Sequence, residues 1–286
     1  MVSGYDGFGG VHDNIVWNQH DGWMCYTLHN KVIFETVKTR EQTVLIDSQS
    51  HLSTIALSAD KRLLAVGEGR AHSRTGNSLI YLYDTVERKL VQKYTFHQRG
   101  VQSLAFSNNA QHLISVGVQG ENNLAIWDLQ SGLVVRSCLI RNTSAVNAIS
   151  VDPYVNTGEH IQFTIVGNQG LFNIYRFEIA SQALQCYEVE DIAPEFKNSD
   201  FTSVAFSHYL NNQGNYQIFL GANDGSMQAY DPTANQFLEA CIKKWVITGE
   251  IGQVRANNQT LVVASSSGSI ARFQVSLINM FPTDNK

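Results

Sequence analysis

The sequence is poor in the residues that would tie it to redox, metal or membrane chemistry. Its 286 residues include four cysteines, and no two of them have the CxxC spacing of a zinc site or a redox dithiol. No stretch approaches the roughly 20 consecutive apolar residues of a membrane-spanning helix. The first ten residues, MVSGYDGFGG, lack the charged segment and apolar run of a signal peptide. We therefore expect a cytoplasmic protein with no membrane partner, whose cysteines serve as small apolar residues.

Charged residues and prolines are also scarce. Charged residues make up 16% of the chain and apolar residues 43%, which favours a large core over disorder. The sequence has four prolines, so glycine, asparagine, aspartate and serine must occupy most turn positions. The net charge of −5 gives no basic footprint and disfavours nucleic acid as the main ligand.

What the sequence does contain is a repeat marked by six aromatic residues. These residues lie 49, 44, 48, 55 and 43 positions apart, at Phe34, Tyr83, Trp127, Tyr175, Tyr230 and Phe273. Each repeat reads as four short strands, and the second strand is nearly all apolar (LLAV, LISV, IFLG, LVVA), as in strands buried on both faces. Periods of about 40–45 residues are typical of four-stranded propeller blades. The sequence predicts an all-β chain with almost no helix and at least about 20 strands in radially arranged sheets.

The third repeat carries the clearest motif. It spans Val101–Arg141, and its third strand ends in Trp127-Asp128. His97 precedes its first strand and Ser115 lies in its second strand. In this pattern the repeat resembles the WD-repeat family. The resemblance implies that His97, Ser115 and Trp127 belong to a hydrogen-bond network that ties blade to blade, with Trp127 buried near the junction with a neighbouring blade.

The same resemblance assigns a fourth network member, an aspartate in the turn before the third strand. The fifth repeat has Asp224 at that place, in NDGSMQAYD. The third repeat has Glu121 and Asn122 there instead, so we expect its own network to be incomplete.

A narrower resemblance covers most of the chain. It rests on the first repeat (HDNIVWNQHDGWMCYTLH), on the extended turn GEGRAHSRTGNSLIYLYD, on HQRGVQSLAFSNNAQHLISVGVQGENNLAIWD and on KKWVITGEIGQV. This order is similar to the first propeller of the cilia- and flagella-associated WD-repeat proteins. It also resembles the echinoderm-microtubule-associated-protein-like proteins and the mitogen-activated-kinase-binding WD scaffolds. The resemblance implies a cytoskeletal or ciliary scaffold.

We expect one WD-repeat β-propeller over residues 1–286. Its six blades are predicted at about 11–47, 51–97, 100–142, 145–192, 200–245 and 250–286. The last repeat shows only three strands, and the family resemblance implies seven blades. Residues 277–286 and 1–10 are too few for another blade of about 40 residues, although they could supply one strand to the sixth. A closed six-bladed ring and part of a seven-bladed ring both remain open, and we favour the second.

No enzyme motif is present. The glycines of GYDGFGG are not followed by the Lys-Ser/Thr of a phosphate loop, and neither GxSxG nor HExxH occurs. The first-strand segments SLAF, AISV and SVAF offer no cluster of acidic or histidine side chains for a propeller hydrolase. We expect no catalytic residue, no cofactor, no metal and no small-molecule substrate.

A partner-binding surface is predicted at the long turn Gly69–Asn77. The turn contains Arg70, His72 and Arg74, and Arg99 lies in the loop HQRG of the next repeat. Arginines on such loops can form bidentate contacts with carboxylates of an acidic protein such as tubulin. The alternative is a solvated, variable insertion, in which case the loops at 152–162 and 208–215 on the opposite face become the candidates.

The preferred interpretation is a non-enzymatic protein-interaction scaffold, microtubule-associated and structural, of cilia, flagella or centrioles. Its partners would be tubulin or other axonemal and cytoskeletal proteins. The alternative is a soluble WD-repeat signalling adaptor that binds kinases or other regulatory proteins.

Overall fold

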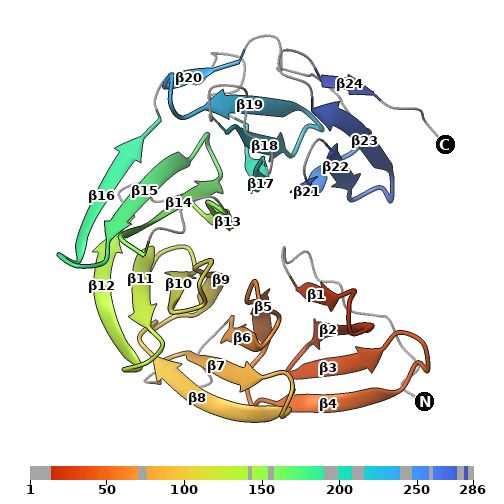
Figure 1. The fold of residues 1–286 in the computed structure, drawn as a ribbon, viewed down its shortest axis with the longest axis vertical. Helices are drawn as coiled ribbons and strands as arrows, with labels where there is room; N and C mark the ends of the chain where they lie inside the picture. Colours follow the sequence, from red (N-terminus) through yellow and green to blue (C-terminus); the bar gives the residue numbers. More distant parts are fainter. Residues whose placement is uncertain are drawn as a thin grey trace. The chain divides into compact units, whose positions relative to one another are not determined.

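The chain folds into six four-stranded antiparallel sheets (Figure 1). The computed structural model describes residues 14–69, 76–140, 144–153, 158–189, 199–207, 216–238, 247–257, 260–275 and 280–282. These residues form 24 strands and no helix, which confirms the all-β prediction. The chain divides into two compact units, Met1–Thr143 and Ser144–Lys286, with three sheets each.

The first unit contains sheets 1, 2 and 3, whose strands follow one another in chain order. Sheet 1 is β1 (Ile15–Asn18), β2 (Trp23–Leu28), β3 (Lys31–Thr36) and β4 (Gln42–Asp47). Sheet 2 is β5 (Leu52–Leu57), β6 (Leu63–Glu68), β7 (Leu79–Asp84) and β8 (Lys89–Thr95). Sheet 3 is β9 (Val101–Phe106), β10 (His112–Gly117), β11 (Asn123–Asp128) and β12 (Leu133–Leu139).

The second unit contains sheets 4, 5 and 6. Sheet 4 is β13 (Val146–Val151), β14 (His160–Gly167), β15 (Phe172–Glu178) and β16 (Ala183–Glu188). Sheet 5 is β17 (Phe201–Phe206), β18 (Ile218–Ala222), β19 (Met227–Asp231) and β20 (Gln236–Phe237). Sheet 6 is β21 (Ile251–Asn257), β22 (Thr260–Ser265), β23 (Ile270–Val275) and β24 (Met280–Pro282). The last repeat, in which the sequence shows three strands, is completed by the short β24, so residues 277–286 supply the fourth strand that the sequence analysis allows.

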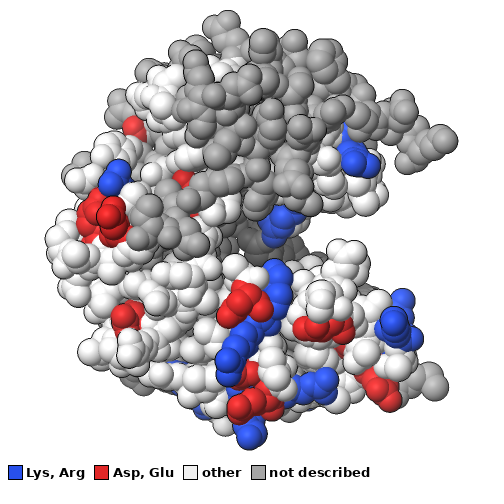
Figure 2. Space-filling model, viewed as in Figure 1, with Lys and Arg blue, Asp and Glu red and all other residues white. Residues whose placement is uncertain are grey.

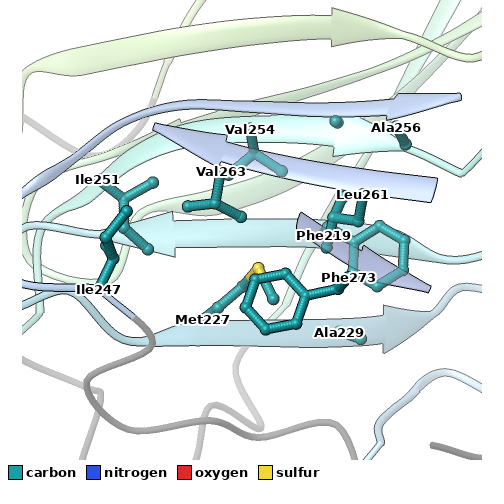
Figure 3. Packing of buried hydrophobic residues seen from close by; sticks show 11 residues of the cluster. Phe219, Met227, Ala229, Ile247, Ile251, Val254, Ala256, Leu261, Val263 and Phe273 are labelled. Atoms are coloured by element: carbon teal, nitrogen blue, oxygen red, sulfur yellow. The ribbon is translucent and has the colours of Figure 1, made fainter. Parts of the chain in front are cut away.

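The second strands are apolar because neighbouring sheets within each unit pack face to face. In sheet 3, every residue of β10 is buried. Figure 3 shows such a junction between sheets 5 and 6, where Phe219 and Met227 pack among residues that include Leu261, Val263 and Phe273. The contact between sheets 5 and 6 is thus largely apolar, as the composition of the second strands predicts.

Five of the six marker aromatics occupy one structural position. Each pairs with a fully buried residue of the second strand, as Trp127 pairs with Leu113 and Tyr230 with Ile218. The same register relates Tyr83, Tyr175 and Phe273 to their neighbours. These side chains are at most 9% exposed. In sheets 2 to 6, the repeating aromatic of the sequence therefore marks one fixed position in the third strand.

The interpretation of Phe34 as the first of these aromatics is wrong. Trp127 is the fifth residue of β11 and packs on the preceding sheet, with its ring 5.0 Å from that of Tyr94. The neighbouring residue on the opposite face of β3 is Glu35. Phe34 faces the following sheet, where the Arg88 guanidinium lies 4.2 Å from its ring centroid. A one-residue shift in a strand moves a side chain to the opposite face.

A bulge near the start of the first strand turns one side chain toward the next sheet. The register shifts at Ser53 in sheet 2 and at Thr202 in sheet 5. Ser53 Oγ lies 3.2 Å from Gly67 O of its own sheet and 2.5 Å from Val101 O of sheet 3. Thr202 Oγ1 likewise contacts a carbonyl of its own sheet and the carbonyl of Ile251 in sheet 6. The bulged hydroxyls thus join neighbouring sheets.

Glycines beside these hydroxyls allow the close approach of the next sheet. A Cβ added to Gly67 would lie 2.8 Å from Val101 Cβ, and one added to Gly221 would lie 2.5 Å from Ile251 Cγ2. Both distances are far below van der Waals contact. The same combination, a hydroxyl and a glycine against a β-branched residue, occurs once in each unit.

Candidate interaction site

Three of the predicted network residues form a continuous buried hydrogen-bond chain. Trp127 Nε1 donates to Ser115 Oγ over 2.9 Å, and His97 Nε2 lies 2.8 Å from the same oxygen. His97 and Ser115 are fully buried and Trp127 is 3% exposed. Because an indole only donates, the serine hydroxyl accepts from Trp127 and its own proton is free for His97 Nε2.

Glu121 completes this chain, so the expectation of an incomplete network in the third repeat is wrong. Its Oε1 lies 2.9 Å from His97 Nδ1, and its Oε2 accepts from the main-chain N–H of Arg99 over 2.7 Å. Glutamate has one methylene more than aspartate, and this reach lets one carboxylate serve both groups. Asn122 Oδ1 instead accepts from Gly120 N within the same turn, over 3.0 Å.

The electrostatics of Glu121 combine two opposing effects. Burial raises the pKa of its carboxyl, but the hydrogen bonds from His97 and from the main-chain N–H groups of Arg99 and Gln98 outweigh burial. The pKa is therefore held below the ordinary value of 4.5. The ionised carboxylate stabilises the folded chain.

This depressed pKa predicts a pH dependence of stability. The contribution of Glu121 is complete above its unfolded pKa of 4.5 and is lost as the pH falls through the lower folded value. Between pH 7 and pH 3, the free energy of unfolding of the wild type should fall more steeply below about pH 4.5 than that of Glu121→Gln. Urea denaturation at each pH measures the difference. Glu87→Gln, an exposed glutamate, is the control, and parallel curves for wild type and Glu121→Gln would contradict the prediction.

Asp224 does not join the other three predicted network residues. It is exposed and lies in the second unit, in the turn between β18 and β19. Its Oδ1 accepts from Ser226 N over 2.9 Å and from Ser226 Oγ over 2.5 Å. Both donors belong to the same turn as Asp224, so the carboxylate stabilises that turn.

Sheet 2 contains a second buried network that the sequence analysis missed. Ser48 Oγ donates to Glu68 Oε1 over 2.7 Å, Tyr81 OH donates to the same oxygen over 2.8 Å, and Leu79 N donates to Oε2 over 2.9 Å. Burial raises the pKa of Tyr81 to about 12. Ser48 stands as far before β5 as His97 stands before β9. The sequence signal for this network is a polar residue, Ser48, four positions before the first strand of the sheet, together with an acidic residue, Glu68, at the end of the apolar second strand.

Of the four predicted partner-binding residues, the structure describes Arg99. Arg99 is exposed, and its Nη1 lies 2.8 Å from the position of a Cβ added to Gly120. Arg70, His72 and Arg74 lie outside the described residues. Gly69, the last described residue before them, lies beside the Arg99 loop, since a Cβ added to Gly100 would lie 2.2 Å from Gly69 O.

The buried polar side chains of the described residues join neighbouring sheets. Within the described ranges, no group of three or more His, Cys, Asp or Glu side chains is placed to hold a metal ion. The same ranges contain no helix long and apolar enough to cross a membrane. The buried histidine, serine and glutamates at the junctions of sheets 1, 2 and 3 bond to one another across the seams.

Comparisons with known proteins give relatives that are named for WD repeats, for the centriole and for cilia and flagella. No family model matches the chain. It is 23% identical over 283 residues to "WD repeat-containing protein 90" of Mus musculus, covering 97% of this chain and 14% of that protein. Over 150 residues, 43% of this chain and 7% of the relative, it is 27% identical to "Centriole proteome protein 16" of Chlamydomonas reinhardtii. It is 31% identical over 128 residues to "Cilia- and flagella-associated protein 52" of the same alga, covering 44% and 20% of the two chains.

The fold is that of the solved WD40 propellers. The structure of the RRP9 WD40 repeats matches with a TM-score of 0.69 and 16% sequence identity, over 96% of this chain and 80% of that chain. Successive four-stranded antiparallel sheets with an aromatic at one fixed position define the class of WD-repeat β-propellers. The chain is a WD-repeat protein, with homologues that include WD repeat-containing protein 90 and cilia- and flagella-associated protein 52. It spans about a seventh of the length of WD repeat-containing protein 90.

Proposed function

We propose that the chain is a non-enzymatic scaffold, microtubule-associated and structural, of cilia, flagella or centrioles. The observation that carries the proposal is that two of the relatives that match this chain are named for the centriole and for cilia and flagella. The fold supports it, because WD40 propellers generally act by binding other proteins. The proposed location is the cytoskeleton, and the proposed partners are tubulin or other axonemal proteins.

The proposed contact surface is the Arg99 loop together with the segment that follows Gly69. A chain with a net charge of −5 is not drawn to acidic tubulin by its overall field, so the contact has to be local. Figure 2 shows basic and acidic side chains interleaved on the visible face of the first unit. Arg99 stands on a loop that the bond from its own main-chain N–H to Glu121 holds in place. The proposed contacts are Arg70, His72, Arg74 and Arg99 with carboxylates of the partner.

Co-sedimentation with purified microtubules tests this function. The chain should pellet with microtubules in a saturable manner, and binding should weaken as salt rises because exposed charges are screened. A chain that stays in the supernatant at every tubulin concentration would contradict the proposal. The alternative of a signalling adaptor would then be preferred, since the same arginines could bind an acidic regulatory protein.

Charge reversal at the proposed surface should weaken partner binding without unfolding the chain. The variant carries glutamate in place of Arg70, Arg74 and Arg99. Its melting temperature should stay at the wild-type value, because solvated loop charges contribute little to stability. The matched control reverses Lys38, Lys89 and Arg136, which are exposed elsewhere. Equal loss of binding in both variants would show that total charge is what matters, and wild-type binding of the first variant would move the interface to the loops at 152–162 and 208–215.

A further inference from the structure

The Arg99 loop, His97–Gly100, is held at both of its ends. It lies between β8 of sheet 2 and β9 of sheet 3. At one end the carbonyl of His97 accepts a hydrogen bond over 2.7 Å from the main-chain N–H of Ser78, which precedes β7 of sheet 2. At the other end the carbonyl of Gly100 accepts over 3.0 Å from the main-chain N–H of Val118, which follows β10 of sheet 3. Each of the two sheets thus fixes one end of the loop.

Between these ends, the side chain of Glu121 holds the main chain of the loop. Its Oε2 accepts from the main-chain N–H of Arg99 over 2.7 Å, and its Oε1 lies 2.9 Å from His97 Nδ1. The main-chain N–H of Gln98 also donates to this carboxylate. The side chain of Glu121 is 5% exposed, so water competes little for these contacts. Both oxygens of the carboxylate are therefore engaged by groups of the loop.

The guanidinium of Arg99 has no acidic partner among the residues that the structure describes. Arg99 is exposed, and the carboxylate beside it, that of Glu121, binds the main-chain N–H and not the guanidinium. Arg99 Nη1 lies 2.8 Å from the position of a Cβ added to Gly120, so the glycine leaves room for the guanidinium against the turn. An arginine that is held in place but unpaired can bind a carboxylate from outside with two parallel hydrogen bonds.

The fold itself does not require an arginine at this place. In sheet 2 the residue at the same offset before the first strand is Ser50, which is 5% exposed and whose main-chain N–H donates to Ser48 Oγ over 3.1 Å. In sheet 5 the loop before the first strand ends in Asp200, whose two oxygens accept from a turn of sheet 4 and a turn of sheet 5. The polar groups of those two loops serve contacts within the fold, whereas the Arg99 guanidinium points to a partner outside it.

We propose that Glu121 is a positioning residue for partner binding, and that Arg99 is the anchor which it presents to a carboxylate-rich segment of the partner. Glu121 fixes the main chain of Arg99 without neutralising its guanidinium. A loop that is ordered before binding loses less conformational entropy when the partner binds. The inference rests on the contact surface of the proposed function and adds an order to it: Arg99 makes the primary contact, and the other three proposed residues add to it.

Nuclear magnetic resonance of the chain with a hexaglutamate peptide tests the anchor without microtubules. The Nε–Hε signal of Arg99 should shift in a saturable manner, because the guanidinium donates to carboxylates of the peptide. Arg99→Lys keeps the charge but loses the planar fork of donors, so the affinity for the peptide should fall about threefold or more. Arg136, exposed in β12, is the matched control: Arg136→Lys should leave the affinity at the wild-type value.

Amide hydrogen exchange and the affinity for the same peptide test the role of Glu121. In Glu121→Ala the main-chain N–H of Arg99 loses its acceptor and should exchange about tenfold faster or more. The affinity should fall about threefold or more, because a loop that is in the binding geometry a third of the time raises the apparent Kd threefold. Ser115→Ala is the control, because it removes the hydroxyl between Trp127 and His97 but keeps the Glu121 contact. It should lower the melting temperature and leave both the Arg99 exchange rate and the affinity unchanged.

Two results would overturn the proposal. One is an equal loss of affinity in Glu121→Ala and Ser115→Ala, which would make Glu121 a purely structural residue. The other is an Arg99 signal that does not respond to the peptide, even if the chain pellets with microtubules. If Glu121→Ala does not fold, Glu121→Asp gives the same comparison, since the shorter side chain cannot serve both His97 and the loop. A chain that binds the peptide through Arg99 but does not pellet would contradict the microtubule function and support this inference.

Discussion

Replacing Trp127 with alanine should lower the free energy of unfolding by about 3–5 kcal/mol, the usual range for a buried large aromatic. The indole is 3% exposed, and its ring lies 5.0 Å from that of Tyr94 and 6.2 Å from that of Phe96. Truncation leaves a cavity between sheets 2 and 3 and removes the donor to Ser115. Urea denaturation followed by circular dichroism measures the loss, since the substitution also removes a fluorophore.

Trp127→Phe separates the two contributions. Phenylalanine keeps most of the ring contacts with Tyr94 but cannot donate to Ser115, so the loss should be smaller, and it measures the hydrogen bond together with the reduced volume. Ser115→Ala removes the hydroxyl between Trp127 and His97 and leaves two buried groups without their partner, which costs about 1–3 kcal/mol for each unsatisfied group. A loss below about 1 kcal/mol for Trp127→Ala would contradict the packing described for the seam between sheets 2 and 3.

The second large effect is expected from a single added methyl group, in Gly221→Ala. The new Cβ would lie 2.5 Å from Ile251 Cγ2 and 3.0 Å from Val254 Cγ2, so sheet 6 has to shift away from sheet 5. Overpacking of this kind costs about 1–3 kcal/mol, and the smaller flexibility of alanine in the unfolded chain returns about 0.4–1 kcal/mol. We expect a net destabilisation, together with a weaker contact between Thr202 and the Ile251 carbonyl.

Two further variants make the Gly221 result specific. Gly252→Ala is the matched control, because an added Cβ at this neighbouring glycine meets only Ala264 O, at 3.9 Å. Its free energy of unfolding should stay close to the wild-type value. Ile251→Ala should cost less in the Gly221→Ala background than in the wild type, since it removes the atom that clashes. Strictly additive losses in this double-mutant cycle would show that Gly221 and Ile251 do not compete for the same space.

The sequence predicts the sheets well because their spacing is set by the fold itself. Every repeat has to return to the same place in the third strand, so Tyr83 and Tyr230 mark that strand even where tryptophan is replaced. Trp127, His97 and Ser115 stand at fixed offsets within one repeat, and the structure brings their polar atoms within hydrogen-bond distance.

The sequence could not predict which residues of β3 point to which face of the sheet, and the reason is physical. In Lys31–Thr36 all four central residues are buried, so the strand lacks the alternation that tells one face from the other. The sequence pattern therefore indicates Phe34 as the marker, although Glu35, which bonds to Arg40 and Gln42, stands at that position. The role of Glu121 was missed for another reason, since a pattern built on aspartate does not show how far a longer side chain reaches.

Amino-acid type also does not show which of the cysteines are buried. Cys25 is fully buried and fits the expectation of a small apolar residue, whereas Cys186 is exposed in β16. The outermost strands have one side toward solvent, and amino-acid type alone does not show which strand of a sheet lies outermost.

The hydroxyl contacts of Ser53 and Thr202 have a consequence for how such repeats can evolve. In both, the acceptor on the next sheet is a main-chain carbonyl, of Val101 or of Ile251. A carbonyl is present whatever residue occupies the position, so mutations in the receiving repeat do not abolish the acceptor. These two hydroxyl contacts therefore tolerate sequence change in the receiving repeat, which fits a chain in which one repeat retains tryptophan-aspartate and the others carry tyrosine, phenylalanine or glutamate at the tryptophan position.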